Sequence, residues 1–331
     1  MGLHYLLLHY DVPVVGDAGA WRVTVDGAVS RPLELSLDDL RARPQVTVPV
    51  ALECAGNGRA RYSPRALSQP WLVEAVGTGE WTGTRLASLL ADAGPSDAAV
   101  EVVFTGADRG VEGGEAQHYR RSLTLDLATA DEVLVVWGLN GGDLPPQHGF
   151  PLRLLVPGWY GMASVKWLRR IEVVTEPFTG YQQARANRMR QHPDDPGIDR
   201  IVVRSPVAPP GIPDFMTRRR VVDAHRPCPV EGRAWSGHGP ITRVEVTTDG
   251  GTTWADAGGA PRAGTARLAP VHLDLGGPGP RRAPARQPRH RRERGRPTPR
   301  AALEPGRLRR HPRPPRRDDG PRVTCRGAAG P

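Results

Sequence analysis

Short apolar runs separated by turn residues fill about the first 175 residues of the chain. Runs rich in valine, isoleucine and leucine predict four β-strands, at residues 100–104, 132–137, 152–156 and 167–174. Ser36, with Asp39 three residues later, predicts a capped helix start. Residues 84–93, closed by Gly94, predict a short amphipathic helix. Strands and helices do not alternate regularly, so we expect a mixed α+β domain over residues 1–180.

Turn residues and alternating apolar and polar residues also indicate how the rest of the chain is organised. Residues 140–143 (Asn-Gly-Gly-Asp) stand between two predicted strands and predict a hairpin. Residues 181–218 are polar, proline-rich and irregular, which is typical of a linking or wrapping segment. Within residues 219–275, an alternating run at 241–246 is followed by a turn signal, Asp-Gly-Gly, at 249–251. This pattern favours an immunoglobulin-like β-sandwich, here truncated.

The last segment, residues 276–331, has a different composition. It contains 17 arginines, 12 prolines and 8 glycines, and no aromatic residue follows Trp254. Such a segment buries too little apolar surface to offset its ordering entropy, which predicts disorder. A frameshift in a GC-rich gene explains it best, because arginine replaces lysine almost everywhere and Lys166 is the only lysine. A native disordered tail and a basic interaction arm remain alternatives.

The distribution of charge argues against binding of nucleic acid. The chain has a formal net charge of +10, but its last 56 residues alone carry +13, from 17 arginines and 4 acidic residues, so the body carries about −3. Nucleic-acid binding needs a basic face on a folded domain. We expect no nucleic-acid partner.

No apolar run approaches the roughly 18 to 20 residues that span a bilayer. Residues 3–8 lack the basic lead and cleavage site of a signal peptide. The sequence therefore predicts a cytoplasmic protein without a membrane partner. Its three cysteines are far apart, which excludes a disulfide framework and a structural zinc site.

Cys54 stands in the most distinctive local context. It ends an apolar run and enters a glycine-rich turn, Leu-Glu-Cys-Ala-Gly-Asn-Gly-Arg at residues 52–59. Small neighbours let the backbone approach a bulky ligand closely. Arg59 can hold an anion or lower the pKa of the thiol. A thiolate here could be a nucleophile or a ligand to a soft metal, and a small buried residue is the simplest alternative.

Two further segments supply hydrogen-bond donors. His148 and Arg153 stand five residues apart at the start of a predicted strand, and Lys166 follows a glycine-led loop. Together with Arg59 they suit an anionic ligand with several polar groups, such as a pterin phosphate. Taken singly, His148 could be a turn histidine and Lys166 a solvated strand end.

Four motifs in order resemble those of the sulfite oxidase family of molybdopterin-dependent oxidoreductases. Cys54 lies in L-x-C-A-G-N, and residues 80–86 resemble the family's W-x-G-x-R-L. Residues 148–153 resemble H-G-F-P-x-R, followed by V-P-G and V-K-W-L. Trp235-Ser236-Gly237 and residues 244–254 are similar to the family's dimerisation domain. The resemblance covers roughly residues 5 to 275 and implies a molybdopterin-binding α+β domain followed by an immunoglobulin-like domain.

The resemblance also implies roles for individual residues. It makes Cys54 the catalytic thiolate ligand of molybdenum and places Arg59 and Trp71 in the substrate pocket. The residues that would bind the cofactor are Tyr5, Leu6, Leu7, Leu8, His9, Cys54, Asp108, His148, Arg153, Ser164, Val165 and Lys166. It implies one Mo-molybdopterin per chain, no haem, a possible homodimer, and a separate electron-transfer protein such as a c-type cytochrome.

This sequence departs from the family pattern where sulfite would bind. Leu7 stands at an arginine position of sulfite-oxidising members, Gly58 where one of a pair of arginines is usual, and Asn187 where a pocket tyrosine falls. A desolvated oxyanion needs convergent cations, so the pocket has lost part of its anion affinity.

The resulting interpretation is two-electron oxygen-atom transfer on a small substrate, with sulfite as the leading single candidate. Reduction of a sulfoxide or N-oxide is the first alternative within the same family. A non-catalytic, degenerate or truncated member is the second. A cysteine hydrolase that uses Cys54 and His148 is a rival from another enzyme class.

Overall fold

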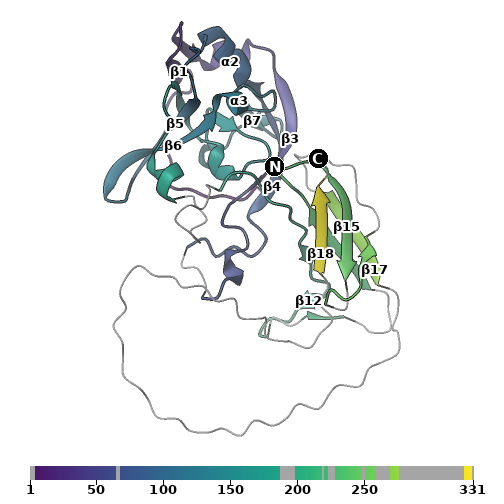
Figure 1. Ribbon diagram of the computed structural model, residues 1–331. Coiled ribbons are helices and arrows are strands. Elements are labelled where there is room, and N and C mark those ends of the chain that lie inside the picture. The colour runs from purple at the N-terminus through teal and green to yellow at the C-terminus, as the bar shows by residue number, and fades with distance from the viewer. Residues whose placement is uncertain are drawn as a thin grey trace, which may run out of the picture.

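The chain forms a sheet-rich body followed by small C-terminal sheets (Figure 1). The computed structural model describes residues 4–64, 68–186, 198–217, 220–222, 228–247, 250–257, 269–275 and 324–329. Most helices of the described part are a single turn or two long, so strands and loops position the functional groups. No helix in these ranges combines the length and the apolar character needed to cross a membrane.

One five-stranded sheet has the order β2-β1-β10-β5-β6. Its strands are β1 (Arg22–Gly27), β2 (Leu33–Ser36), β5 (Glu101–Glu112), β6 (Glu115–Thr124) and β10 (Leu168–Val174). Strands β1 and β10 pair in parallel although they are far apart in sequence, and the other pairs are antiparallel. The predicted strand at 100–104 therefore overlaps the first third of a longer strand, β5.

A second sheet carries the segment that leads to Cys54. It contains β3 (Val46–Glu53), β4 (Val76–Arg85), β7 (Leu134–Leu139), β8 (Gly142–Asp143) and β9 (Arg153–Leu155). Strand β3 pairs with β4 along its whole length, from Val46↔Gly83 to Glu53↔Val76. Cys54 is the first residue after this paired strand, so the sheet fixes where the thiol-bearing loop begins.

The local predictions can be compared with the elements directly. The predicted cap is present: Ser36 and Asp39 form a reciprocal capping box on α1 (Leu37–Arg41). The hairpin prediction is also confirmed, because Gly138↔Asp143 and Leu139↔Gly142 pair across Asn140-Gly141, both with positive φ. The predicted start of the second helix was wrong by two residues. Helix α2 (Leu86–Ala93) begins only where β4 ends, because the preceding Thr84 and Arg85 pair with β7.

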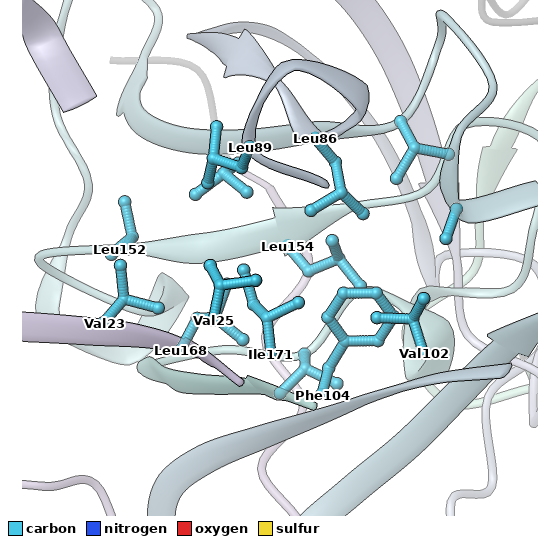
Figure 2. Packing of buried hydrophobic residues seen from close by; sticks show 14 of the residues in the cluster. Val23, Val25, Leu86, Leu89, Val102, Phe104, Leu152, Leu154, Leu168 and Ile171 are labelled. Carbon is cyan, nitrogen blue, oxygen red and sulfur yellow. The ribbon is translucent and has the colours of Figure 1, made fainter. Parts of the chain in front are cut away.

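The main core lies between the two sheets and under α2. Side chains from α2, β1, β5, β9 and β10 meet there (Figure 2), and Phe104, Leu86 and Leu154 have no exposed surface. Strand β7 is buried along its whole length: Val135 and Trp137 face this core, while Val136 and Leu139 face a second cluster with Trp81. Burial on both faces holds the second sheet rigidly in place.

The C-terminal part consists of small antiparallel sheets. One pairs β11 (Val207–Ala208), β14 (Cys228–Ala234) and β17 (Ala269–Leu275); another pairs β16 (Ala255–Asp256), β15 (Ile241–Thr247) and β18 (Thr324–Ala329). A short hairpin joins β12 (Ile212–Pro213) and β13 (Arg220–Val221). The described strands do not confirm an immunoglobulin-like sandwich. Strand β18 comes from the predicted tail, of which residues 276–323 lie outside the described ranges.

Candidate active site

A single cavity gathers most of the predicted site residues from segments far apart in the sequence. Those that line it are Tyr5, Leu6, Leu7, His9, Cys54, Asp108, His148, Arg153, Ser164 and Lys166. Four predicted residues do not line it: Leu8, Arg59, Trp71 and Val165. Its wall also contains residues that sequence reasoning missed, namely His4, Leu52, Ala55, Gly56, Gln69, Tyr119, Gly161 and Met162.

Cys54 is held by its own loop. Its N–H donates to Ala75 O at 2.9 Å, and its carbonyl accepts from Asn57 N–H at 2.9 Å. The Gly56 N–H donates to Sγ at 3.3 Å. Burial raises the pKa of the Cys54 thiol above its ordinary value, and the bond from Gly56 opposes this only partly. The thiol is therefore a poor nucleophile at neutral pH, and a bound cation would be needed to keep it as thiolate.

Arg153 is a buried cation bonded only to uncharged groups. Its side chain donates to His148 O at 2.9 Å and to Ser164 O at 3.0 Å, and its guanidinium carbon lies 5.0 Å from the centre of the Trp81 ring. Burial lowers the pKa of Arg153 to about 10, so it stays protonated at neutral pH. Within the described ranges no carboxylate pairs with it. An anion bound in the cavity would balance the charge of Arg153.

Lys166 and Asp108 are two further incompletely paired groups. Lys166 Nζ donates to Leu7 O at 2.9 Å and to Gln147 O at 3.0 Å. Burial, aided by Arg153, lowers its pKa to about 7. Asp108 is 4% exposed, and its Oδ1 has no hydrogen-bond partner. Burial raises the pKa of Asp108 to about 7, although Lys166 opposes the rise. A carboxyl oxygen without a donor and basic groups without an anionic partner suit one ligand that carries both N–H donors and negative charge.

Neutral aromatic groups complete the wall. Burial, with His4, Arg153 and Lys166 nearby, lowers the pKa of His148 to about 4, so its ring is uncharged at neutral pH. The rings of His4 and His148 meet edge to face, with their centres 5.5 Å apart. His4 directly precedes the predicted segment 5–9, and this adjacency was the available signal for it. Tyr119 donates to Met162 O at 2.8 Å. It stands on β6, where no sequence motif marks it.

The predicted substrate residues lie around the loop that follows Cys54. Arg59 does not reach the cavity itself but donates to Gln69 Oε1 at 2.9 Å, and Gln69 does line it. Trp71 contributes its carbonyl, which accepts from Ala60 N–H at 3.0 Å. Leu7 lines the cavity with no charge of its own. Asn187 lies outside the described residues.

Comparisons with known proteins agree with this arrangement. Residues 9–182 match the oxidoreductase molybdopterin binding domain, and residues 200–269 match the Mo-co oxidoreductase dimerisation domain. The chain is 35% identical over 275 residues to nitrate reductase [NADH] 1 of Oryza sativa subsp. japonica, covering 76% of this chain and 30% of that protein. It is 34% identical over 277 residues to the nitrate reductase [NADH] of Ulva prolifera, covering 77% and 32%. It therefore spans about a third of the length of these relatives.

A solved structure shares the fold as well. The sulfane dehydrogenase SoxCD from Paracoccus pantotrophus superposes with a TM-score of 0.65 at 27% identity, over 79% of this chain and 65% of that chain. The molybdopterin-binding match alone extends over more than half of the sequence. On these grounds the chain belongs to the sulfite oxidase family of molybdopterin-dependent oxidoreductases.

Proposed function

We propose that this protein transfers an oxygen atom between water and a small substrate bound beside Cys54, while two electrons pass between that substrate and a separate electron-transfer protein. The observation that carries the proposal is the unmatched polarity of one cavity. An Asp108 carboxyl with one unpartnered oxygen, two basic side chains bonded only to carbonyls, and a buried thiol converge there. A closed apolar core does not explain this set, since the Asp108 oxygen lacks a donor and neither basic side chain has an anionic hydrogen-bond partner.

The residues present fit a molybdopterin cofactor. A pterin ring carries N–H groups that Asp108 Oδ1 could accept, and its phosphate carries charge that Arg153 and Lys166 could balance. His148 is neutral and can donate or accept at one edge of the ligand. Cys54 would supply the protein thiolate to the metal, and Gly56 N–H would orient its sulfur. When bound, the cofactor supplies two-electron redox chemistry coupled to oxygen-atom transfer.

Sulfite is the first substrate to test. Arg59 is a cation of the Cys54 loop, and it donates a hydrogen bond to Gln69, which lines the cavity. The apolar Leu7 weakens anion binding, which keeps sulfoxide or N-oxide reduction as an alternative. Reduction of nitrate is a second candidate, favoured by the curated relatives, which are nitrate reductases. In each case a separate electron-transfer protein, such as a c-type cytochrome, would exchange electrons with the bound cofactor. The second domain would mediate homodimer formation.

The cofactor assignment is tested by metal analysis. The full chain is purified from a host that makes molybdopterin, and its molybdenum and pterin fluorescence are measured. We expect metal and pterin in the wild type and in Cys228→Ser, because Cys228 lies in the second domain. We expect Cys54→Ser to lose molybdenum. A wild type without molybdenum would refute the proposed function.

The reaction is tested on the loaded protein. Sulfite is offered with ferricyanide or cytochrome c as electron acceptor, and nitrate or a sulfoxide with reduced viologen as donor. Turnover of sulfite that is lost in Cys54→Ser supports the leading candidate, and turnover of nitrate alone supports the second. Bound cofactor without turnover of any of the three supports a non-catalytic member.

A further inference from the structure

The residue directly before Cys54 is a fully buried carboxylate. Glu53 has no exposed surface and ends strand β3. One of its oxygens accepts a hydrogen bond from Trp235 Nε1 at 2.7 Å. The other accepts from Asn57 Nδ2 at 2.9 Å and lies 3.3 Å from Arg204 Nε. Trp235, which donates the hydrogen bond, and Arg204, which forms the ion pair, both come from the part of the chain that matches the dimerisation domain.

Trp235 and Arg204 form a unit. The backbones of Arg204 and Trp235 pair with each other, with N–H to carbonyl distances of 2.9 and 3.0 Å in the two directions. Their side chains then reach the same carboxylate. Arg204 Nη2 also donates to Asn57 O at 3.2 Å, so the unit contacts the loop at both Glu53 and Asn57.

These contacts continue to the thiol through the loop itself. Asn57 N–H donates to Cys54 O at 2.9 Å, and Asn57 Oδ1 accepts from Ala75 N–H at 3.3 Å. Ala75 O in turn accepts from Cys54 N–H. The backbone on either side of Cys54 is therefore fixed by groups that depend on the Glu53 carboxylate remaining in place. A buried carboxylate that loses a donor is strongly disfavoured, so the loop would rearrange to bring it to water.

We propose that Trp235 and Arg204 are positioning residues for Cys54, through which the second domain holds the thiol in place to bind the cofactor. The proposal rests on the proposed function in one respect, that Cys54 is the protein ligand of the metal. It extends the role of the second domain beyond dimerisation. A purely structural role in joining the two domains would not act selectively on Cys54.

The same interface provides a matched control. Arg200 Nη1 donates to Gly237 O at 3.0 Å, and its guanidinium carbon lies 6.0 Å from the centre of the Trp159 ring. Its contact with the Trp159 ring joins the same two parts of the chain without touching Glu53. Arg200→Gln therefore weakens the interface, whereas Trp235→Phe removes a hydrogen-bond donor and Arg204→Gln removes a cation from the carboxylate.

The test measures the reactivity of the Cys54 thiol in full-length protein made without cofactor. Cys228 and Cys325 are replaced by serine, and alkylation by iodoacetamide is followed at one fixed pH. Because the loop must open for the thiol to react, we expect Trp235→Phe and Arg204→Gln to be alkylated about tenfold faster, and Arg200→Gln at about the wild-type rate. Adding Glu53→Gln to Trp235→Phe should slow alkylation again, because a neutral amide tolerates the missing donor.

A second measurement uses protein loaded in a molybdopterin-competent host. The two positioning variants should lose molybdenum during dialysis faster than Arg200→Gln does. Equal alkylation rates in Trp235→Phe, Arg204→Gln and Arg200→Gln, or no rescue by Glu53→Gln, would overturn the proposal. The alkylation measurement needs no metal, so it stands apart from the proposed function, which fails instead if the wild type carries no molybdenum.

Discussion

Asp108→Asn should stabilise the cofactor-free protein while it weakens cofactor binding. The carboxyl is 4% exposed, and one of its oxygens has no partner. An asparagine has nearly the same shape but carries no charge at any pH. The substitution thus removes a charge that the cavity does not compensate until a ligand is present.

The size of the effect follows from the pKa. Burial raises the pKa of Asp108 from an ordinary 3.8 to about 7. Between these values the folded chain holds a proton that the unfolded chain has released. The contribution of this group to stability is therefore fully present below pH 3.8 and is lost as the pH rises through about 7. Because each tenfold change in proton affinity corresponds to about 1.4 kcal/mol, the loss is at most about 4 kcal/mol.

Urea unfolding of cofactor-free protein at several pH values between 4 and 8 measures this difference. The free energy of unfolding of Asp108→Asn should match that of the wild type near pH 4, exceed it increasingly up to about pH 7, and stay higher by a constant amount above that pH. Asp97→Asn, at an exposed position, is the control and should parallel the wild type. Parallel profiles for Asp108→Asn and wild type would refute the reasoning. In a molybdopterin-competent host, the same variant should retain less pterin.

Three stability predictions concern the framework, each measured by urea unfolding of the cofactor-free chain. Ser36→Ala removes the capping box with Asp39 and should lower the free energy of unfolding by about 1 kcal/mol. Phe104→Ala empties a position with no exposed surface and should cost about 3–5 kcal/mol. Gly83→Ala places a methyl group against the Val135 carbonyl, where β4 and β7 approach closely, and should cost about 1–3 kcal/mol. A Ser36→Ala loss larger than the Phe104→Ala loss would contradict this ranking.

Local chemistry explains which elements could be predicted from the sequence. The cap at Ser36 and the turn at Asn140 depend on neighbouring residues only, and both are present. Strand β6 (Glu115–Thr124) was not predicted, because it is largely polar and contains no apolar run. It forms through pairing with β5 across Gly113-Gly114, where both residues have positive φ. That glycine pair was the signal available in the sequence.

For the candidate site too, local motifs could be predicted from the sequence and long-range contacts could not. The motifs around Cys54, His148 and Lys166 could be found in the sequence, and the fold brings all three to one cavity. The support of the Cys54 loop could not, because Glu53 and Trp235 are 182 residues apart and no spacing rule links them. Likewise, Arg59 stands next to the thiol loop in sequence, yet its guanidinium points to Gln69 and not into the cavity.

The contacts of Lys166 have a practical consequence for chemical labelling. The chain has a single lysine, so amine-directed reagents can modify only this side chain and the N-terminal amine. With its pKa lowered to about 7, about half of the ε-amine is uncharged and nucleophilic near neutral pH, whereas an ordinary lysine is almost fully protonated there. An acylating reagent should therefore act as a one-site reporter of the cavity. Mass spectrometry of the peptide around Lys166 would then count the protein molecules with an empty cavity and those with a bound cofactor in one sample.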